Sequence, residues 1–241
     1  MEAWITGQVG QDLYQKFVKG YTKKQWGRDP KDLPASIIKR IPIRTEFNDF
    51  YFDDVYQGIP VNGYTEMVNN MLEGIVVQLN TDYLKNRKVL DGCATQVVYT
   101  GPIDAFFNYE FGALDYRGLR FETKQVNKEF EQEVAVMNFT KEEIPFTRIV
   151  EHKHFTPGIK TQNTFITKEY PKEWQKGDEA FYPVNDEINK RLYKKYEAKA
   201  NEDNVLFGGR LGQYKYYDMH QVIAAALSQC DKVLKKNEKI I

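Results

Sequence analysis

The sequence predicts an α+β fold with a mostly helical first third, a middle part of antiparallel strands, and a C-terminal strand and helix. Apolar residues recur at helical spacing in the first third, and short β-branched and aromatic segments follow one another from residue 97 to residue 170. A charged helical segment, a strand, a glycine turn and a last helix then complete the chain. We expect three domains, at 1–75, 76–183 and 184–241.

The first third contains three predicted helices. In residues 11–19, apolar and aromatic side chains recur four positions apart, which predicts an amphipathic helix that Gly20 ends. Prolines on either side delimit a short helix over 33–41, and a threonine caps a helix predicted over 65–71. Residues 75–79 are β-branched and apolar, which predicts a strand.

The middle third contains short segments of strand composition. They cover residues 97–100, 119–123, 134–139, 146–155 and 164–170. Consecutive strands without intervening helices indicate antiparallel pairing, and alternating side chains within 146–155 indicate a sheet with two distinct faces. The C-terminal part then predicts a charged helix over 185–197, a strand over 204–208 and a helix over 218–235.

Composition excludes several classes of function. Lys plus Arg and Asp plus Glu both total 34, so no excess charge attracts nucleic acid or an anionic membrane, and no apolar segment is long enough to span a bilayer. Cys93 and Cys230 lie far apart without zinc-ligand spacing, which suits a cytoplasmic protein. His152 and His154 alternate without a third ligand nearby, and His220 is remote, so we expect no metal site.

Two segments resemble one known family. Residues 17–27 are F-V-K-G-Y-T-K-K-Q-W-G and residues 208–219 are G-G-R-L-G-Q-Y-K-Y-Y-D-M. Both resemble UDP-galactopyranose mutase, the flavoenzyme family that interconverts UDP-galactopyranose and UDP-galactofuranose for cell-surface polysaccharides. The family opens with a G-x-G-x-x-G turn that this sequence lacks. The resemblance therefore implies that this chain corresponds to the central and C-terminal portion of the family. Its last strand and helix are then the remnant of an incomplete FAD-binding Rossmann-like domain, and their apolar faces are partly uncovered.

The resemblance implies a set of substrate contacts. Arg40, in a mobile loop, and Arg148 bind the diphosphate and are the expected catalytic residues, since a planar guanidinium makes paired bonds to phosphate oxygens. Tyr21 stacks on uracil. The full set is Phe17, Tyr21, Thr22, Trp26, Arg40, Tyr51, Asn138, Arg148, Tyr182 and Tyr216. From residue type alone, these arginines fit an ordinary surface and these aromatics fit an ordinary core.

The resemblance also implies FAD, reduced for activity, which reacts through an adduct between flavin N5 and the sugar. The expected cofactor contacts are Gly209, Arg210, Tyr217, Asp218, Met219, His220, Gln221 and Val222, with residues 100–104 as a turn near the flavin. A helix N-terminus favours anionic groups there. A simple N-cap at Asp218 and a glycine turn explain the same pattern without a ligand.

Several functions therefore remain open from the sequence. The chain is expected to be a mutase portion, an isomerase acting on UDP-galactose, that binds FAD poorly and is inactive without the missing domain. The alternatives are a UDP-sugar-binding module, a structural or dimerisation module that forms a homodimer, and another flavoprotein of the amine-oxidase-like superfamily. Retained flavin absorbance, or UDP binding without it, distinguishes an enzyme from a binding module.

Overall fold

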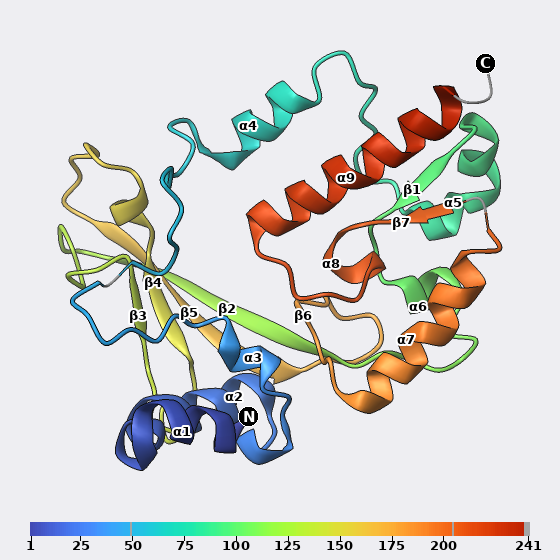
Figure 1. Cartoon of the computed structure of the whole chain (residues 1–241). Helices are drawn as coiled ribbons and strands as arrows, with labels where there is room; N and C mark the ends of the chain where they lie inside the picture. Colours follow the sequence, from blue (N-terminus) through green and yellow to red (C-terminus); the bar gives the residue numbers. More distant parts are fainter. Residues whose placement is uncertain (49, 204, 239–241) are drawn as a thin grey trace. The chain divides into compact units, whose positions relative to one another are not determined.

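The structure, a computed structural model, describes residues 1–48, 50–203 and 205–238 (Figure 1). Contacts divide the chain into two units. Unit 1 consists of Met1–Leu79 and Leu119–Lys172, and unit 2 of Asn80–Gly118 and Glu173–Ile241. Each unit has a buried cluster of its own, centred on Ile5, Tyr14 and Ile38 in unit 1 and on aromatic residues in unit 2.

Unit 1 begins with three consecutive helical segments, the first of which is kinked at Gly10, where φ is +80°. They are α1 (Glu2–Leu13), a π-helix η1 (Tyr14–Lys19) and α2 (Gly20–Trp26). The prediction that Gly20 ends a helix is wrong, because its φ of −66° is right-handed helical and the helix continues to Gly27, whose φ is +63°. The left-handed glycine that ends a helix therefore lies seven residues later than predicted.

The other predictions for the first 79 residues are only partly correct. A 3-10 turn η2 (Pro30–Asp32) and a short α3 (Ser36–Lys39) occupy the region of the second predicted helix, and α4 (Gly63–Met71) contains the third. The strand predicted at 75–79 does not form, and Val76 is 96% exposed. Apolar, β-branched composition favours a strand, but a strand also needs a neighbour to satisfy its backbone groups.

The strands of unit 1 pair antiparallel, as predicted. They are β2 (Tyr116–Val126), whose first residues belong to unit 2, β3 (Val136–Asn138), β4 (Arg148–Glu151) and β5 (Thr164–Glu173), which ends in unit 2. Their order is β3-β4-β5-β2. The segment predicted as a strand to residue 155 leaves the sheet after Glu151 and forms the 3-10 turn η4 (His152–Phe155). Figure 1 shows α1 and α2 at one end of these strands.

Unit 2 combines helices with a parallel pair of strands. Its elements are α5 (Tyr83–Leu90), η3 (Asp91–Cys93), β1 (Val97–Tyr99), α6 (Ile103–Phe106), β6 (Tyr182–Pro183), α7 (Glu187–Ala200), β7 (Val205–Phe207), α8 (Gly209–Gly212) and α9 (Met219–Glu238). The antiparallel prediction for 97–100 is wrong, because β1 pairs in parallel with β7. The start of the strand predicted at 204 lies outside the described residues. With β6 antiparallel to the start of β2, the expected α+β class is confirmed.

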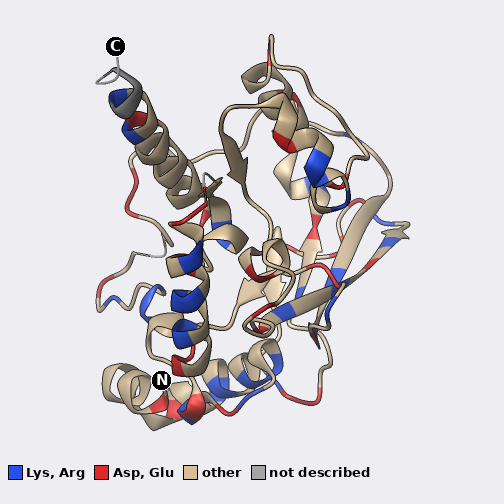
Figure 2. Ribbon diagram, turned by 90° about the vertical axis from the view of Figure 1, so that its right-hand side faces the viewer, with Lys and Arg blue, Asp and Glu red and all other residues tan. Residues whose placement is uncertain are grey.

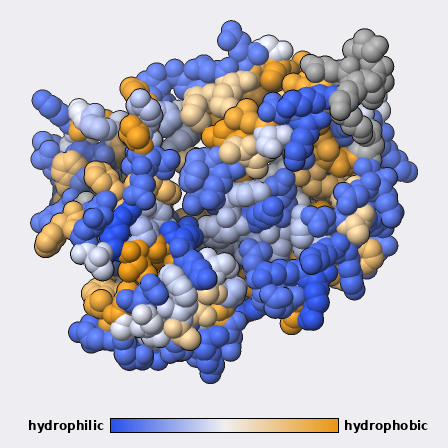
Figure 3. Space-filling view, viewed as in Figure 1, coloured by the Kyte–Doolittle hydropathy of each residue, from blue (hydrophilic) through white to orange (hydrophobic). Residues whose placement is uncertain are grey.

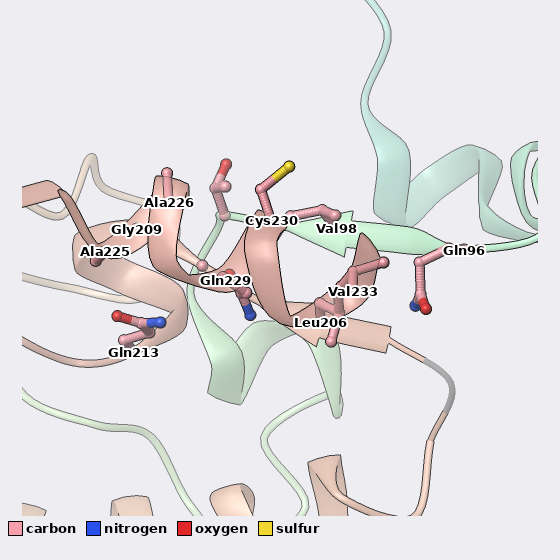
Figure 4. A pocket seen from close by; sticks show the side chains of 12 residues that line it. Gln96, Val98, Leu206, Gly209, Gln213, Ala225, Ala226, Gln229, Cys230 and Val233 are labelled. Carbon is pink, nitrogen blue, oxygen red and sulfur yellow. The ribbon is translucent and has the colours of Figure 1, made fainter. Parts of the chain in front are cut away.

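Helix α9 packs along the parallel pair of strands and also exposes apolar side chains. Ala225, Gln229 and Val233 line an apolar cavity of about 240 Å³ together with Val98 and Leu206 of the strands (Figure 4). Met219, Ile223, Leu227 and Leu234 of the same helix are exposed. The face shown in Figure 3 carries orange, hydrophobic residues among blue, hydrophilic ones.

Basic and acidic residues are interspersed along the ribbon in Figure 2. In the part of the chain that the structure describes, no helix combines the length and the apolar character needed to cross a bilayer.

Candidate functional site

The segment at residues 17–27 packs helix α2 tightly against the connection between β3 and β4. Gly20 is buried there, and a Cβ atom added to it would lie 2.3 Å from the backbone oxygen of Thr140. Any side chain would therefore push the helix away from the connection. A close approach of two backbones, rather than helix termination, explains the glycine.

Two consecutive lysines of α2 bind this connection. Lys24 Nζ donates to the backbone oxygens of Phe139, Ile144 and Phe146 at 2.7, 3.0 and 3.0 Å. Burial lowers the pKa of Lys24, against the opposing effect of nearby glutamates. Lys23 Nζ forms a more exposed ion pair with Glu142 at 2.8 Å.

The same helix brings Tyr21 to Arg148. The Arg148 guanidinium donates from Nη2 to the Tyr21 hydroxyl at 3.0 Å, and both residues are half-buried. Arg148 lies opposite Asn138 of β3 and opposite Glu169 of β5. Residues directly opposite on neighbouring strands project from the same face of a sheet. The structure therefore brings three of the predicted substrate residues together in unit 1.

Glu169 is a member of this group that the sequence argument missed. Its Oε2 lies 3.2 Å from Arg148 Nε, an ion-pair distance. Burial raises the pKa of Glu169, and the positive charge of Arg148 partly opposes this. The alternation of side chains along β5 indicated which of its residues share a face. Only the register of β4 against β5 showed that Glu169 lies opposite Arg148.

The remaining predicted residues of the first 80 differ widely in exposure. Thr22 and Trp26 are buried on α2, at 5% and 7% exposure, whereas Phe17 on the π-helix is 60% exposed. Arg40 is exposed at the C-terminal end of α3. Tyr51 is 42% exposed in the connection from α3 to α4, which has no helix or strand among its described residues. The predicted roles of these residues remain predictions.

In unit 2, Arg210 holds the two predicted tyrosines. The rings of Tyr182 and Tyr216 stack with centroids 5.3 Å apart and planes 9° apart. The Arg210 guanidinium lies 4.9 Å from the Tyr216 centroid and donates to the backbone oxygens of Phe181 and Tyr217. A planar cation on an aromatic face adds attraction to those hydrogen bonds.

The residues predicted to contact a flavin are largely engaged by the chain itself. The φ of Gly209 is +73°, a left-handed conformation that favours glycine, and a Cβ there would make only an ordinary contact of 3.5 Å with Thr100 Cβ. At the start of α9, the backbone N–H of Asp218 donates to Gln221 Oε1, and the backbone N–H of Val222 donates to the backbone oxygen of Asp218. Met219, His220 and Gln221 are exposed.

The histidines and a buried carboxylate of unit 1 have structural partners. Glu151 is fully buried and accepts from the backbone N–H groups of Glu131 and Gln132. Burial alone raises its pKa, but these hydrogen bonds and nearby His154 lower the pKa overall. His152 contacts the Thr167 hydroxyl at 2.7 Å. Among the described residues, no group of three or more His, Cys, Asp or Glu side chains is arranged to hold a metal.

A sequence profile decides the family. The profile of UDP-galactopyranose mutase matches residues 16–216. This range includes helix α2, Arg148 with its neighbours Asn138 and Glu169, and Arg210 with Tyr182 and Tyr216. The chain belongs to the UDP-galactopyranose mutase family. The resemblance carried by residues 17–27 and 208–219 is therefore confirmed for the family as a whole.

Curated relatives agree with the profile. The chain is 39% identical to dTDP-fucopyranose mutase of Escherichia coli and 40% identical to a probable UDP-galactopyranose mutase of Klebsiella pneumoniae. It is 33% identical to UDP-galactopyranose mutase of Mycoplasma pneumoniae. These matches cover 96%, 94% and 93% of this chain, and 63%, 59% and 61% of the relatives. The chain thus spans less than two thirds of the length of these family members.

Proposed function

We propose that this chain is the substrate-binding portion of a mutase, an isomerase that interconverts the pyranose and furanose forms of a nucleotide-linked sugar. Unit 1 binds the nucleoside diphosphate, with the base on Tyr21 and the diphosphate on Arg148. The observation that carries this proposal is the hydrogen bond between the Arg148 guanidinium and the Tyr21 hydroxyl, which places a cationic fork beside an aromatic ring.

Each residue of this group has a distinct chemical role. Arg148 donates to diphosphate oxygens and neutralises the charge that accumulates when the diphosphate leaves the anomeric carbon. The carboxylate of Glu169 orients the guanidinium, and the exposed amide of Asn138 is available for a sugar or phosphate oxygen. Arg40, exposed after α3, supplies a second cation to the diphosphate.

The flavin implied by the family needs residues that can contact it. Arg210 is committed to two backbone oxygens, so the described residues fit such a cofactor through the glycine turn at Gly209 and the start of α9 at residues 217–222. When bound, a reduced flavin supplies the nucleophile for the anomeric carbon. The substrate-binding roles expected for Tyr182 and Tyr216 of unit 2 remain predictions.

The substrate class follows from the relatives. One is named for a uridine nucleotide with galactose and another for a thymidine nucleotide with fucose. An aromatic platform and a diphosphate fork serve either nucleotide, because both share a pyrimidine ring and a pyrophosphate. We propose UDP-galactose as the substrate and dTDP-fucose as the alternative substrate. Comparing the affinities of the chain for the two nucleotide sugars would distinguish them.

Calorimetric titration of UDP tests the nucleotide site. We expect the wild-type chain to bind UDP and the Arg148→Ala variant to bind it about 10- to 100-fold more weakly, the effect of removing a charged hydrogen-bond donor. Arg120→Ala is the matched control, because Arg120 lies on β2 of the same unit in a surface pair with Glu122. Equal affinity of the wild type and Arg148→Ala would refute the role of Arg148.

A second candidate function, self-association, is favoured by the apolar face of α9. Exposed apolar side chains at helical spacing, such as Ile223 and Leu227, are suited to packing against another helix. Sedimentation velocity of the wild type and of Leu227→Glu tests this function. A monomeric wild type would exclude it.

A further inference from the structure

The ammonium group of Lys24 is hydrogen-bonded to the backbone of the connection between β3 and β4. Its Nζ donates to three backbone oxygens, those of Phe139, Ile144 and Phe146. An ammonium group has three donors, so this set satisfies its full donor capacity. Burial lowers the pKa of Lys24, because desolvation disfavours the charged form of the ammonium group.

These three oxygens belong to the connection between β3 and β4. Asn138 ends β3 before this connection, and Arg148 begins β4 after it. Tyr21 lies three residues before Lys24 on α2, so both side chains project from neighbouring positions of the helix. A bond from Lys24 to the connection therefore limits the movement of the Tyr21 ring relative to the Arg148 guanidinium.

We propose that Lys24 is a positioning residue of the nucleotide site, which holds the base platform Tyr21 at a constant distance from the diphosphate fork Arg148. This inference rests on the proposed function of unit 1. Lys24 acts through these two residues, and its ammonium group is occupied by backbone oxygens. The geometry predicts a larger effect on ligands that engage both residues than on ligands that engage only Tyr21.

Lys23 provides the matched control. It lies next to Lys24 and binds the same connection, through Glu142. Its side chain is 51% exposed and that of Glu142 is 45% exposed, so solvent screens the ion pair and it contributes little to the attachment. Replacement of Lys23 removes one positive charge from the same helix without removing the three hydrogen bonds.

The experiment is a calorimetric titration of the 241-residue chain with UDP and with uridine, for the wild type, Lys24→Met and Lys23→Met. Uridine engages the ring platform, and UDP engages both the platform and the fork. We expect Lys24→Met to lower UDP affinity on the order of tenfold and uridine affinity less than about twofold, and Lys23→Met to change neither by more than about twofold. A general loss of structure would instead lower both affinities together.

The outcomes separate this inference from the proposed function. Equal UDP affinity of Lys24→Met and the wild type, or an equal loss for UDP and uridine, would overturn the positioning role. If the wild type binds neither ligand, the proposed function fails. Amide hydrogen exchange of residues 139–147 then decides the attachment: faster exchange in Lys24→Met than in Lys23→Met supports it, and unchanged exchange overturns it. If circular dichroism shows that Lys24→Met does not fold, Lys24→Gln is judged by the same criteria.

Discussion

Replacement of Gly20 by alanine tests the packing of α2 most directly. The backbone of Gly20 is right-handed helical, so alanine causes no dihedral strain there. The added Cβ would lie 2.3 Å from the Thr140 oxygen, well inside the 3.0 Å below which such contacts are essentially never found. That oxygen belongs to the backbone, so the helix or the whole connection must move.

The magnitude follows from two opposing effects. Alanine is favoured over glycine in a helix interior by about 1 kcal/mol. Forcing an extra carbon into a closely packed site costs about 1–3 kcal/mol. Gly7→Ala is the matched control, because Gly7 lies within α1 and its added Cβ would meet nothing within 4 Å. We expect Gly7→Ala to raise the free energy of unfolding and Gly20→Ala to lower it, a difference of about 1–3 kcal/mol.

Urea denaturation followed by circular dichroism measures both variants against the wild type. The same displacement of α2 should move Tyr21 away from Arg148, so Gly20→Ala should also weaken UDP binding while Gly7→Ala should not. A Gly20→Ala variant at least as stable as Gly7→Ala would contradict the close approach of the two backbones. The glycine would then require another explanation.

Three further changes test other parts of the structure. Glu151→Gln should lower the free energy of unfolding at pH 7 by about 1–3 kcal/mol. The folded-state pKa of Glu151 is below its ordinary value of 4.5, so its contribution to stability is present above pH 4.5 and is lost as the pH falls through the lower pKa. In urea titrations, the free energy of unfolding of the variant should therefore fall less in acid than that of the wild type. Tyr21→Phe keeps the ring but removes the hydroxyl that accepts from Arg148, so calorimetry should show less than about a tenfold loss of UDP affinity and no loss for uridine. Arg210→Lys should lower the stability of unit 2 in urea by about 1–3 kcal/mol, because lysine cannot reproduce the two guanidinium bonds to backbone oxygens. An unchanged midpoint in the last variant would show that Arg210 is not needed to hold the tyrosine pair.

Much of the local structure could be predicted from the sequence. The charged helix α7 and the final helix α9 were predicted within a few residues, because their patterns are long and periodic. Strands β2 and β5 were predicted in place but too short. Helix α5 was missed.

The errors lie where one segment depends on a distant one. Gly20 has the residue type that usually ends a helix, and only the approach of Thr140, 120 residues later, shows why glycine is needed within one. Residues 97–99 have strand composition, but their parallel pairing depends on residues 205–207. The role of Glu169 likewise depends on the register that places it opposite Arg148.

The sequence by itself determined the family and the α+β composition, and it supplied the residues proposed for the nucleotide site apart from Glu169, since side-chain type and local periodicity are properties of neighbouring positions. Only the tertiary structure decided which of those residues meet, that Tyr21 contacts Arg148, and that Lys24 joins α2 to the strands. The physical reason is that hydrogen bonds act over about 3 Å, whereas these partners lie more than a hundred residues apart along the chain.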